Sequence, residues 1–142
     1  MTEVSFYILN QAALAERINY ACRLIEKAHK NRMSVIVHCE SQDQAQVMDE
    51  TLWSLKPERF IPHALLSEGV PSCPVIISHG DEVPAPKDIL INLSQKTPTF
   101  FSQFNRHFEI LCQSADVLAA GREKWRFFQD RGYPMKKFDI AS

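Results

Sequence analysis

The chain has 142 residues, 45% of them hydrophobic, which is enough apolar mass for one domain over residues 1–142 with a substantial core. Its formal net charge of -1 argues against a general nucleic-acid-binding protein, because such proteins usually carry a positive excess over the whole domain. No apolar run approaches the roughly 20 residues that a membrane-spanning helix needs, and the N-terminal residues lack the basic start and apolar core of a secretory signal.

The first half of the chain alternates between strand-like and helix-like segments. Residues 4–9 form an apolar strand pattern, and residues 11–30 carry an apolar stripe at helical spacing. A β-branched strand is predicted at residues 34–39 and a helix at residues 41–55, with its first serine as the N-cap. Residues 57–74 contain four prolines, which favours a long structured loop.

The second half continues the same alternation. Two nearly continuous apolar runs, at residues 74–78 and 88–93, are typical of buried, largely parallel strands. The remaining elements are a short helix at 98–106, a strand at 107–112, a long helix at 114–130 and an extended edge segment at 136–140. This pattern predicts an α/β fold, a three-layer α/β/α sandwich around a largely parallel central sheet.

The glycine positions argue against a nucleotide-binding site in this sandwich. A phosphate loop needs glycines in the first strand-to-helix turn, where the backbone approaches the phosphates closely. Residues 9–11 contain none, and the four glycines of the chain form neither a dinucleotide-binding motif nor a P-loop. The sequence therefore predicts a fold that resembles nucleotide-binding domains, has no phosphate loop and uses no cofactor.

Catalytic and metal-binding candidates are few. His38 and Cys39 end a predicted strand at the sheet edge where α/β proteins usually place their sites, so they are candidates for a nucleophilic pair or a partial metal site. Adjacent strand residues point to opposite faces, however, and therefore do not readily converge on one atom. The acidic turn at residues 79–82 has no second carboxylate cluster to complete a cation site. We expect no catalytic constellation and no metal.

The cysteines predict a reducing environment. Cys22, Cys39, Cys73 and Cys112 are scattered singly, without a C-x-x-C pair or a disulfide-like spacing. Cys39 and Cys112 lie in strand-like apolar runs, so buried, reduced thiols are expected. Together with the absence of a secretory signal pattern, this indicates a cytoplasmic protein.

A basic, aromatic segment lies near the C-terminus. Residues 121–138 contain six of the 16 Lys and Arg residues, interleaved with aromatic side chains. On a helix, Arg122, Trp125, Arg126 and Gln129 share one face because they are spaced at i, i+3, i+4 and i+7. A cationic face around an aromatic ring suits a ligand that is both anionic and aromatic. The alternative is an amphipathic helix with solvated basic residues and aromatic residues in the core.

A second aromatic segment crosses the end of a predicted helix. Within residues 49–63, Trp53 lies at the end of the predicted helix, a proline then breaks the helix, and the following loop carries Phe60, Ile61 and Pro62. Large aromatic side chains supply contact area, and proline lowers the ordering cost of binding, so this segment is a candidate protein-contact surface. The alternative is that the aromatic side chains cap the sheet core.

The order of these segments carries a family resemblance. The residues that carry the resemblance are, in chain order, 6–9, 45–53, 60–65, 68–69, 74–77, 88–93, 122–126 and 132–133. This series resembles the chi subunit of bacterial DNA polymerase III over nearly the whole chain. The resemblance implies a non-catalytic subunit of the polymerase holoenzyme, part of the clamp-loader assembly in DNA replication, on an α/β sheet fold without a nucleotide site.

The resemblance also implies the partners and the residues that bind them. The acidic C-terminal tail of single-stranded-DNA-binding protein is expected at Arg122, Trp125, Arg126 and Gly132. The psi subunit of the clamp loader is expected at Trp53, Phe60 and Pro62, where a repair helicase is an alternative partner. DNA is then reached only indirectly, with no membrane involved. Gln129 stands where the family has a basic residue, which leaves Arg131 as the candidate for that charge.

Two other functions remain open from the residues alone. The stretch 121–138 could bind single-stranded nucleic acid directly, with aromatic rings stacking on bases and cations neutralising phosphates. A cryptic nucleotide hydrolase or nuclease on an α/β scaffold is the other alternative. Nuclease chemistry needs clustered carboxylates to hold metal, and the acidic residues here are dispersed.

Overall fold

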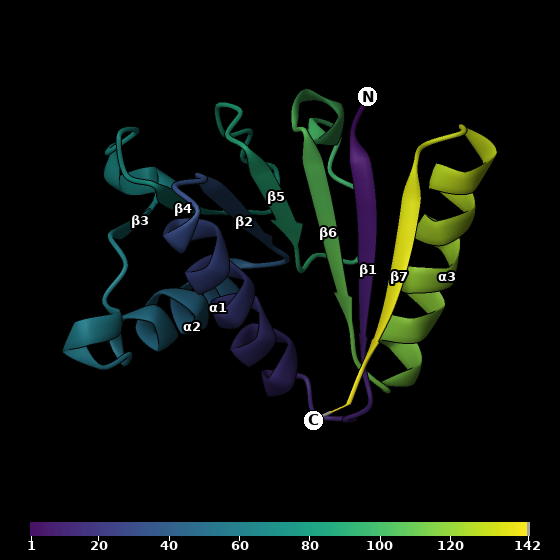
Figure 1. Ribbon diagram of the computed structural model, residues 1–142, viewed down its shortest axis with the longest axis horizontal. Helices are drawn as coiled ribbons and strands as arrows, with labels where there is room; N and C mark the ends of the chain where they lie inside the picture. Colours follow the sequence, from purple (N-terminus) through teal and green to yellow (C-terminus); the bar gives the residue numbers. More distant parts are fainter. Residues whose placement is uncertain (142) are drawn as a thin grey trace.

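The central sheet has seven strands, all parallel (Figure 1). The computed structural model describes residues 1–141, and the strand order is β3–β4–β2–β5–β6–β1–β7. The strands are β1 (Glu3–Leu9), β2 (Val35–Cys39), β3 (His63–Leu65), β4 (Val75–His79), β5 (Ile89–Asn92), β6 (Arg106–Leu111) and β7 (Met135–Ile140). The prediction of an α/β sandwich with a largely parallel sheet is confirmed.

Within residues 1–141, three α-helices form the outer layers: α1 (Ala15–Lys30), α2 (Gln42–Trp53) and α3 (Ala115–Asp130). α1 and α2 cover one face of the sheet and α3 covers the other (Figure 1). Successive strand residues point to opposite faces, so Val35 and Val37 of β2 join the core beneath α1 and α2, and Ile36 joins the core beneath α3. Burial on both faces explains the continuous apolar sequence of this strand.

The helix starts follow local chemistry. α1 begins at Ala15, four residues later than predicted, because the preceding apolar residues have no surface to pack against and Leu14 is 59% exposed. α2 begins after Ser41, whose hydroxyl accepts a hydrogen bond from the Gln44 backbone N–H at 3.2 Å, which confirms the predicted N-cap. None of the helices within residues 1–141 is long and apolar enough to cross a membrane.

The short helix predicted at residues 98–106 is wrong. The chain makes only a single 3-10 turn there, at Phe101–Gln103, and has already entered β6 at Arg106. The spacing of Phe100, Phe101 and Phe104 looks helical, but these three rings instead fill the core beneath α3. Packing of the aromatic side chains therefore outweighs the local helical pattern.

The proline-rich stretch 57–74 is more ordered than the predicted loop. It contains β3 and two 3-10 turns, at Pro57–Arg59 and Leu66–Glu68. β3 lies at one edge of the sheet and pairs in parallel with β4, with His63 opposite Val75. Residues 136–140, predicted as an extended edge segment, lie in β7 at the other edge and pair in parallel with β1.

Candidate functional site

The exposed face of α3 carries the predicted cationic residues. Its inward face buries Val117, Gly121, Lys124 and Phe128 against the sheet. Arg122 and Arg126 lie one turn apart on the solvent side, and Gln129 is exposed next to them. Neither arginine takes part in any of the seven ion pairs found within residues 1–141. Two guanidinium groups are thus free to receive an anionic partner.

Trp125 lies at the boundary between this surface and the core. Its ring packs edge-to-face on the buried Phe6, with 5.1 Å between ring centroids, and the side chain is only partly buried. The predicted spacing is right, but Trp125 both supports α3 and offers an exposed part of its ring beside Arg122 and Arg126. An apolar group of a ligand can contact that exposed part while the cations hold its charge.

The end of α3 is set by Gly132 and Arg131. Gly132 has a φ of 74°, a left-handed conformation that suits glycine, and it turns the chain toward β7. The Arg131 guanidinium lies 3.8 Å from the centre of the Phe127 ring and donates a hydrogen bond to the Phe127 carbonyl at 3.2 Å. At 100° per residue, Phe127 faces away from Gln129. Arg131 is therefore held against Phe127, on the other flank of α3 from Gln129.

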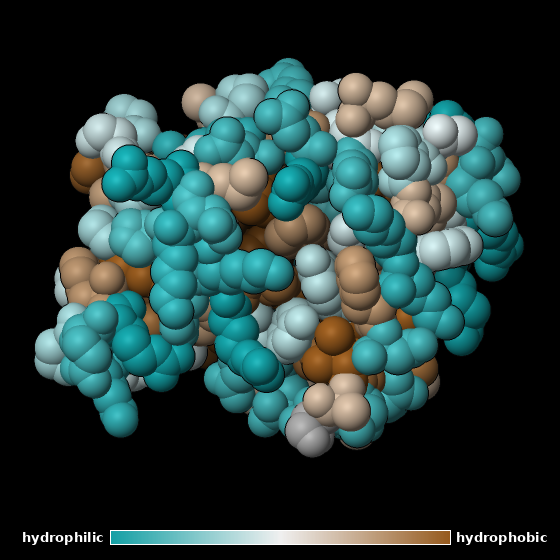
Figure 2. Space-filling model, viewed as in Figure 1, coloured by the Kyte–Doolittle hydropathy of each residue, from teal (hydrophilic) through white to brown (hydrophobic). Residues whose placement is uncertain are grey.

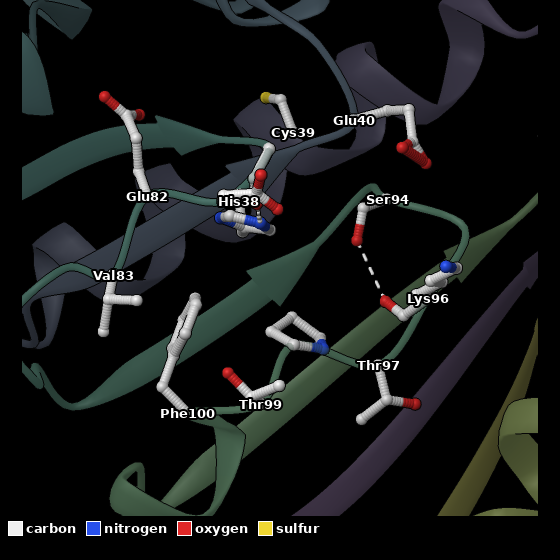
Figure 3. Close-up of a pocket in the computed structure, with 13 residues that line it drawn as sticks. His38, Cys39, Glu40, Glu82, Val83, Ser94, Lys96, Thr97, Thr99 and Phe100 are labelled. Atoms are coloured by element: carbon white, nitrogen blue, oxygen red, sulfur yellow. Dashed lines mark hydrogen bonds between the residues drawn. The ribbon is translucent and has the colours of Figure 1, made fainter.

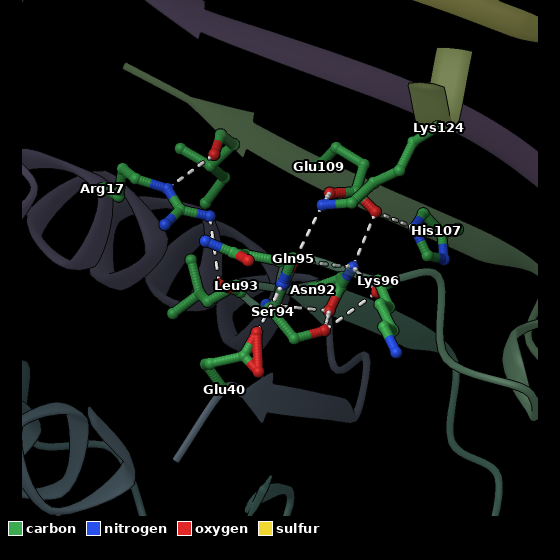
Figure 4. A network of polar contacts seen from close by, with 11 residues as sticks. Arg17, Glu40, Asn92, Leu93, Ser94, Gln95, Lys96, His107, Glu109 and Lys124 are labelled. Atoms are coloured by element: carbon green, nitrogen blue, oxygen red, sulfur yellow. Dashed lines mark hydrogen bonds and ion pairs between the residues drawn. The ribbon is translucent and has the colours of Figure 1, made fainter. Parts of the chain in front are cut away.

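One of the six cations of the segment is not on the surface. Lys124 is buried, and its ammonium group lies 2.9 Å from the fully buried carboxylate of Glu109 on β6 (Figure 4). The same carboxylate receives hydrogen bonds from Asn92 at 2.8 Å and from His107 at 2.6 Å. Lys124 also donates to the Ser94 carbonyl at 2.7 Å. Lys124 is therefore not available to a ligand on the surface of α3.

This network anchors α3 to the sheet. Burial alone raises the pKa of the Glu109 carboxyl, but Lys124, His107 and Asn92 outweigh burial and hold that pKa below its ordinary value. The sequence carries a signal for this network. Glu109 is an acid within an apolar strand, two residues from His107 on the same side, and Lys124 falls in the inward stripe of α3.

A second surface forms where α2 ends. Trp53 and Phe60 are 59% and 44% exposed, and their ring centroids lie 5.4 Å apart. Pro62 is exposed next to them, whereas Ile61 is buried in the core. The structure therefore brings the three predicted residues to the surface, and the alternative that the two rings cap the sheet core does not hold.

Polar contacts that the sequence did not reveal fix this aromatic surface. The buried His63 ring packs 4.8 Å from Trp53 and approaches the Asp49 carboxylate at 3.4 Å. Burial raises the pKa of Asp49, while His63 acts in the opposite direction. Arg59 forms an ion pair with Glu26 of α1, which ties the 3-10 turn Pro57–Arg59 to the helix layer.

A cavity of about 340 Å³ lies at the carboxyl ends of β2, β4 and β5 (Figure 3). His38 lines it, but the two ring nitrogens contact the Ser78 hydroxyl at 2.8 Å and the Gly80 carbonyl at 3.1 Å. Burial lowers the pKa of His38 and raises that of the Cys39 thiol to about 12, so Cys39 is not a thiolate at neutral pH. No group of three or more metal-ligating side chains gathers anywhere in residues 1–141.

Comparison with known proteins gives a consistent result. Residues 1–136 match the family described as "DNA polymerase III chi subunit, HolC". The chain is 38% identical over 136 residues to DNA polymerase III subunit chi of Pseudomonas aeruginosa, which covers 96% of this chain and 95% of that protein. The identity is 30% over 138 residues with the subunit chi of Haemophilus influenzae (96% of each chain) and 24% over 139 residues with that of Escherichia coli K12 (94% and 95%).

Proposed function

Since the chain belongs to the DNA polymerase III chi subunit family and thus takes part in DNA replication, we propose that it is a non-catalytic bridging subunit. One surface binds the psi subunit of the clamp loader, and another binds the acidic C-terminal tail of single-stranded-DNA-binding protein. It acts as one domain, in the cytoplasm, and reaches coated DNA through the tail.

The observation that supports bridging is the separation of the two surfaces. Trp53 and Phe60 lie where α2 ends, and α2 packs on β2, β3 and β4 in one half of the sheet. Arg122 and Arg126 lie on α3, which packs on β6 in the other half and on the opposite face. Figure 1 shows α2 and α3 at opposite ends of the molecule. Two partners can therefore be held at the same time without competing for space.

The chemistry of α3 fits an acidic tail with a free terminal carboxylate. Arg122 and Arg126 have no internal ion pair within the described part of the chain, and a guanidinium can hold a carboxylate through two parallel hydrogen bonds. The exposed part of the Trp125 ring can receive the apolar side chain that carries the carboxylate. Such contacts are modest and salt-sensitive, which suits a subunit that must release its partner.

The test is a calorimetric titration with two acidic peptides that end in the same apolar residue, one a free acid and the other an amide. Amidation removes the anion that the arginines hold, so the amide should bind about thirty-fold more weakly or worse. The difference should shrink at high salt, because exposed charges are screened over about 10 Å at 0.1 M. Equal affinities for the two peptides would show that the arginines do not bind the terminal carboxylate.

A second test concerns the aromatic surface. Trp53→Ala and Phe60→Ala should each weaken binding of the psi subunit by about 2 kcal/mol or more, roughly thirty-fold, because exposed aromatic residues at interfaces are frequent hot spots. Co-purification and surface plasmon resonance provide the measurement. Leu14→Ala is the matched control, because Leu14 is as exposed as Trp53 and lies on another element.

Two outcomes of this test are informative. Loss of psi binding with a normal unfolding midpoint supports the proposal, and tail-peptide binding should then be unchanged. Wild-type affinity in both folded variants would refute the assignment. The same variants also address a repair helicase as alternative partner, since we propose that it uses Trp53 and Phe60 in place of psi.

The structure favours neither alternative function. Direct binding of nucleic acid by residues 121–138 needs several stacking rings, but Phe128 is fully buried and Trp125 is only partly exposed. One of the six cations of this stretch, Lys124, is buried against Glu109 and cannot contact a phosphate. A nucleotide hydrolase needs an activated group in the cavity, whereas His38 is engaged with Ser78 and Gly80.

A further inference from the structure

One face of the sheet is left uncovered at its β1–β7 end. α1 packs on β6 and reaches β1 through Tyr20, and Figure 1 shows no helix lying in front of β7 on this side among residues 1–141. Side chains of alternate residues fill this face, with Tyr7 from β1, Phe108 from β6 and Phe138 from β7 in mutual contact around Tyr7. Phe138 is 40% exposed, which is unusual for a phenylalanine in a strand.

Three aromatic rings form a continuous row on this face. The Tyr7 ring stacks on Phe138 at 5.1 Å with an angle of 18° between the planes, and Tyr20 of α1 lies 5.6 Å from Tyr7 on its other side. Burial raises the pKa of Tyr7 and of Tyr20, so both phenols stay uncharged at neutral pH and do not repel an anion. We call the row formed by Tyr20, Tyr7 and Phe138 the aromatic row.

Cations surround the aromatic row. The Arg23 guanidinium lies 5.5 Å from the centre of the Tyr20 ring. Lys27 and Arg106 line a small cavity of about 80 Å³ together with Tyr7. All three are exposed, and none belongs to an ion pair within residues 1–141. Lys136 lies two residues before Phe138 in β7, on the same side of the strand, and forms an ion pair with Glu3 at 3.4 Å.

This arrangement gives a positive surface on a chain whose net charge is -1. Against its four cations stand two acids, Glu3, which is paired with Lys136, and Glu16, which accepts a hydrogen bond from Gln11. Figure 2, drawn from the side of this face, shows pale and brown side chains over β1 and β7 between hydrophilic side chains in teal. Neither tail-binding residue Arg122 nor Arg126 belongs to it, because α3 lies on the opposite face.

We propose that this face, the aromatic row with Arg23, Lys27 and Arg106, binds single-stranded nucleic acid. Phe138 is the exposed member of the row, so a base of an unpaired strand can stack on its ring while the phosphates attract the unpaired cations, and one ligand satisfies both features. An open sheet face with aromatic side chains is one of the surfaces that proteins use for unpaired bases. A base pair in a duplex hides the flat faces that the row would contact, so the surface selects single strands. This direct contact adds to the proposed tail route and does not depend on it.

The test is fluorescence anisotropy with a labelled oligothymidylate of about 15 nucleotides at several salt concentrations, with a duplex of equal length and an acidic peptide in parallel. Phe138→Ala should reduce the affinity for the oligothymidylate roughly 5- to 150-fold, the range for losing one base–aromatic stack. Its matched control is Val83→Ala, which truncates an exposed apolar side chain elsewhere (66% exposed).

The charge contribution is tested with exposed residues, so that folding is preserved. Single strands give a slope of log affinity against log salt of about -0.7 per phosphate contact, so three free cations predict a slope near -2. Arg23→Ala with Arg106→Ala should reduce that slope by about 1.4, whereas Lys56→Ala should leave it unchanged.

The outcomes are distinct. Oligothymidylate binding that is weakened by the aromatic and the double-arginine variants, and that exceeds binding of the duplex, supports the inference. Absence of oligothymidylate binding at low salt would overturn it, as would binding that is lost only with Arg122→Ala and Arg126→Ala. Preference for the acidic peptide, with the same dependence on Phe138 and Arg106, would assign the face to a protein partner and overturn the inference as well. Tail-peptide affinity of the same variants reports on the proposed function separately.

Discussion

Glu109→Ala is expected to lower the free energy of unfolding by about 3–5 kcal/mol. The reason is that Lys124 would remain charged and buried without the carboxylate that it contacts at 2.9 Å, while Asn92 and His107 would lose their acceptor. Urea denaturation followed by circular dichroism measures the change. A loss below about 1 kcal/mol would mean that water or a shift of α3 compensates, and the anchoring role would be wrong.

A paired variant separates charge from packing. Glu109→Gln with Lys124→Met removes both charges, keeps an oxygen that can accept from Asn92 and His107, and preserves most of the volume. It should recover most of the stability lost in either single variant, because replacing a buried ion pair is often close to neutral whereas breaking it is not. If the double variant is as unstable as Glu109→Ala, shape and not charge dominates this site.

The same group predicts a pH dependence. In the folded protein the pKa of Glu109 lies below its ordinary value of 4.5, because Lys124, His107 and Asn92 outweigh the effect of burial. The folded state therefore binds this proton less readily than the unfolded chain does. The stabilisation is complete above the unfolded-state pKa and is lost as the pH falls through the lower, folded-state pKa. Glu109→Gln should flatten this acid limb of the stability curve.

Arg126→Ala combined with Arg122→Ala is expected to abolish binding of the acidic tail peptide while the fold stays intact. Removing one partner of a charge-paired interface contact costs roughly 2–5 kcal/mol, which is about thirty-fold to several thousand-fold in affinity. Both residues are exposed, and exposed charges contribute only about 0–1 kcal/mol to stability. Calorimetric titration gives the affinity, and thermal unfolding confirms the fold.

The controls for this prediction follow from the structure. Lys56→Ala removes an exposed cation far along the chain from α3 and should leave the peptide affinity unchanged. Trp125→Ala is a poor choice, since the ring packs on Phe6 and its loss would also weaken the core. Trp125→Phe retains an aromatic contact and should reduce binding less than the arginine variants, with little salt dependence. Unchanged peptide binding in the double arginine variant would show that the tail does not bind at Arg122 and Arg126 of α3.

Much of this fold could be predicted because strong local patterns determine it. The continuous apolar runs of β2, β4 and β5 result from burial on both faces of a parallel sheet, so they identify both the strands and the sheet type. Ser41 could be recognised as an N-cap because its hydroxyl acts on the adjacent turn. β3 could not be recognised, since three residues among prolines become a strand only through pairing with β4.

In the candidate surfaces, too, local sequence predicts some features, whereas others depend on contacts with distant elements. Helical spacing alone gave the exposed positions of Arg122 and Arg126. The burial of Lys124 depends on Glu109, which lies on another element, and the support of Trp53 depends on His63 from β3. The open face around Tyr7 combines α1 with the strands β1 and β7 from opposite ends of the chain, so no local window of sequence could reveal it.

The position of β1 has a consequence for synthesis of the protein. β1 is translated before the other six strands of the sheet, yet both of its neighbours, β6 and β7, come after Asn105 in the chain. On the ribosome the strand therefore waits with both edges unpaired until β6 and β7 have been translated. α3 connects β6 to β7 in the chain. A nascent chain that lacks these elements therefore has an incomplete sheet and no α3 for a partner to bind. During this interval the unpaired edges of β1 can pair wrongly with other strands or bind chaperones. The interval ends when β7 pairs with β1.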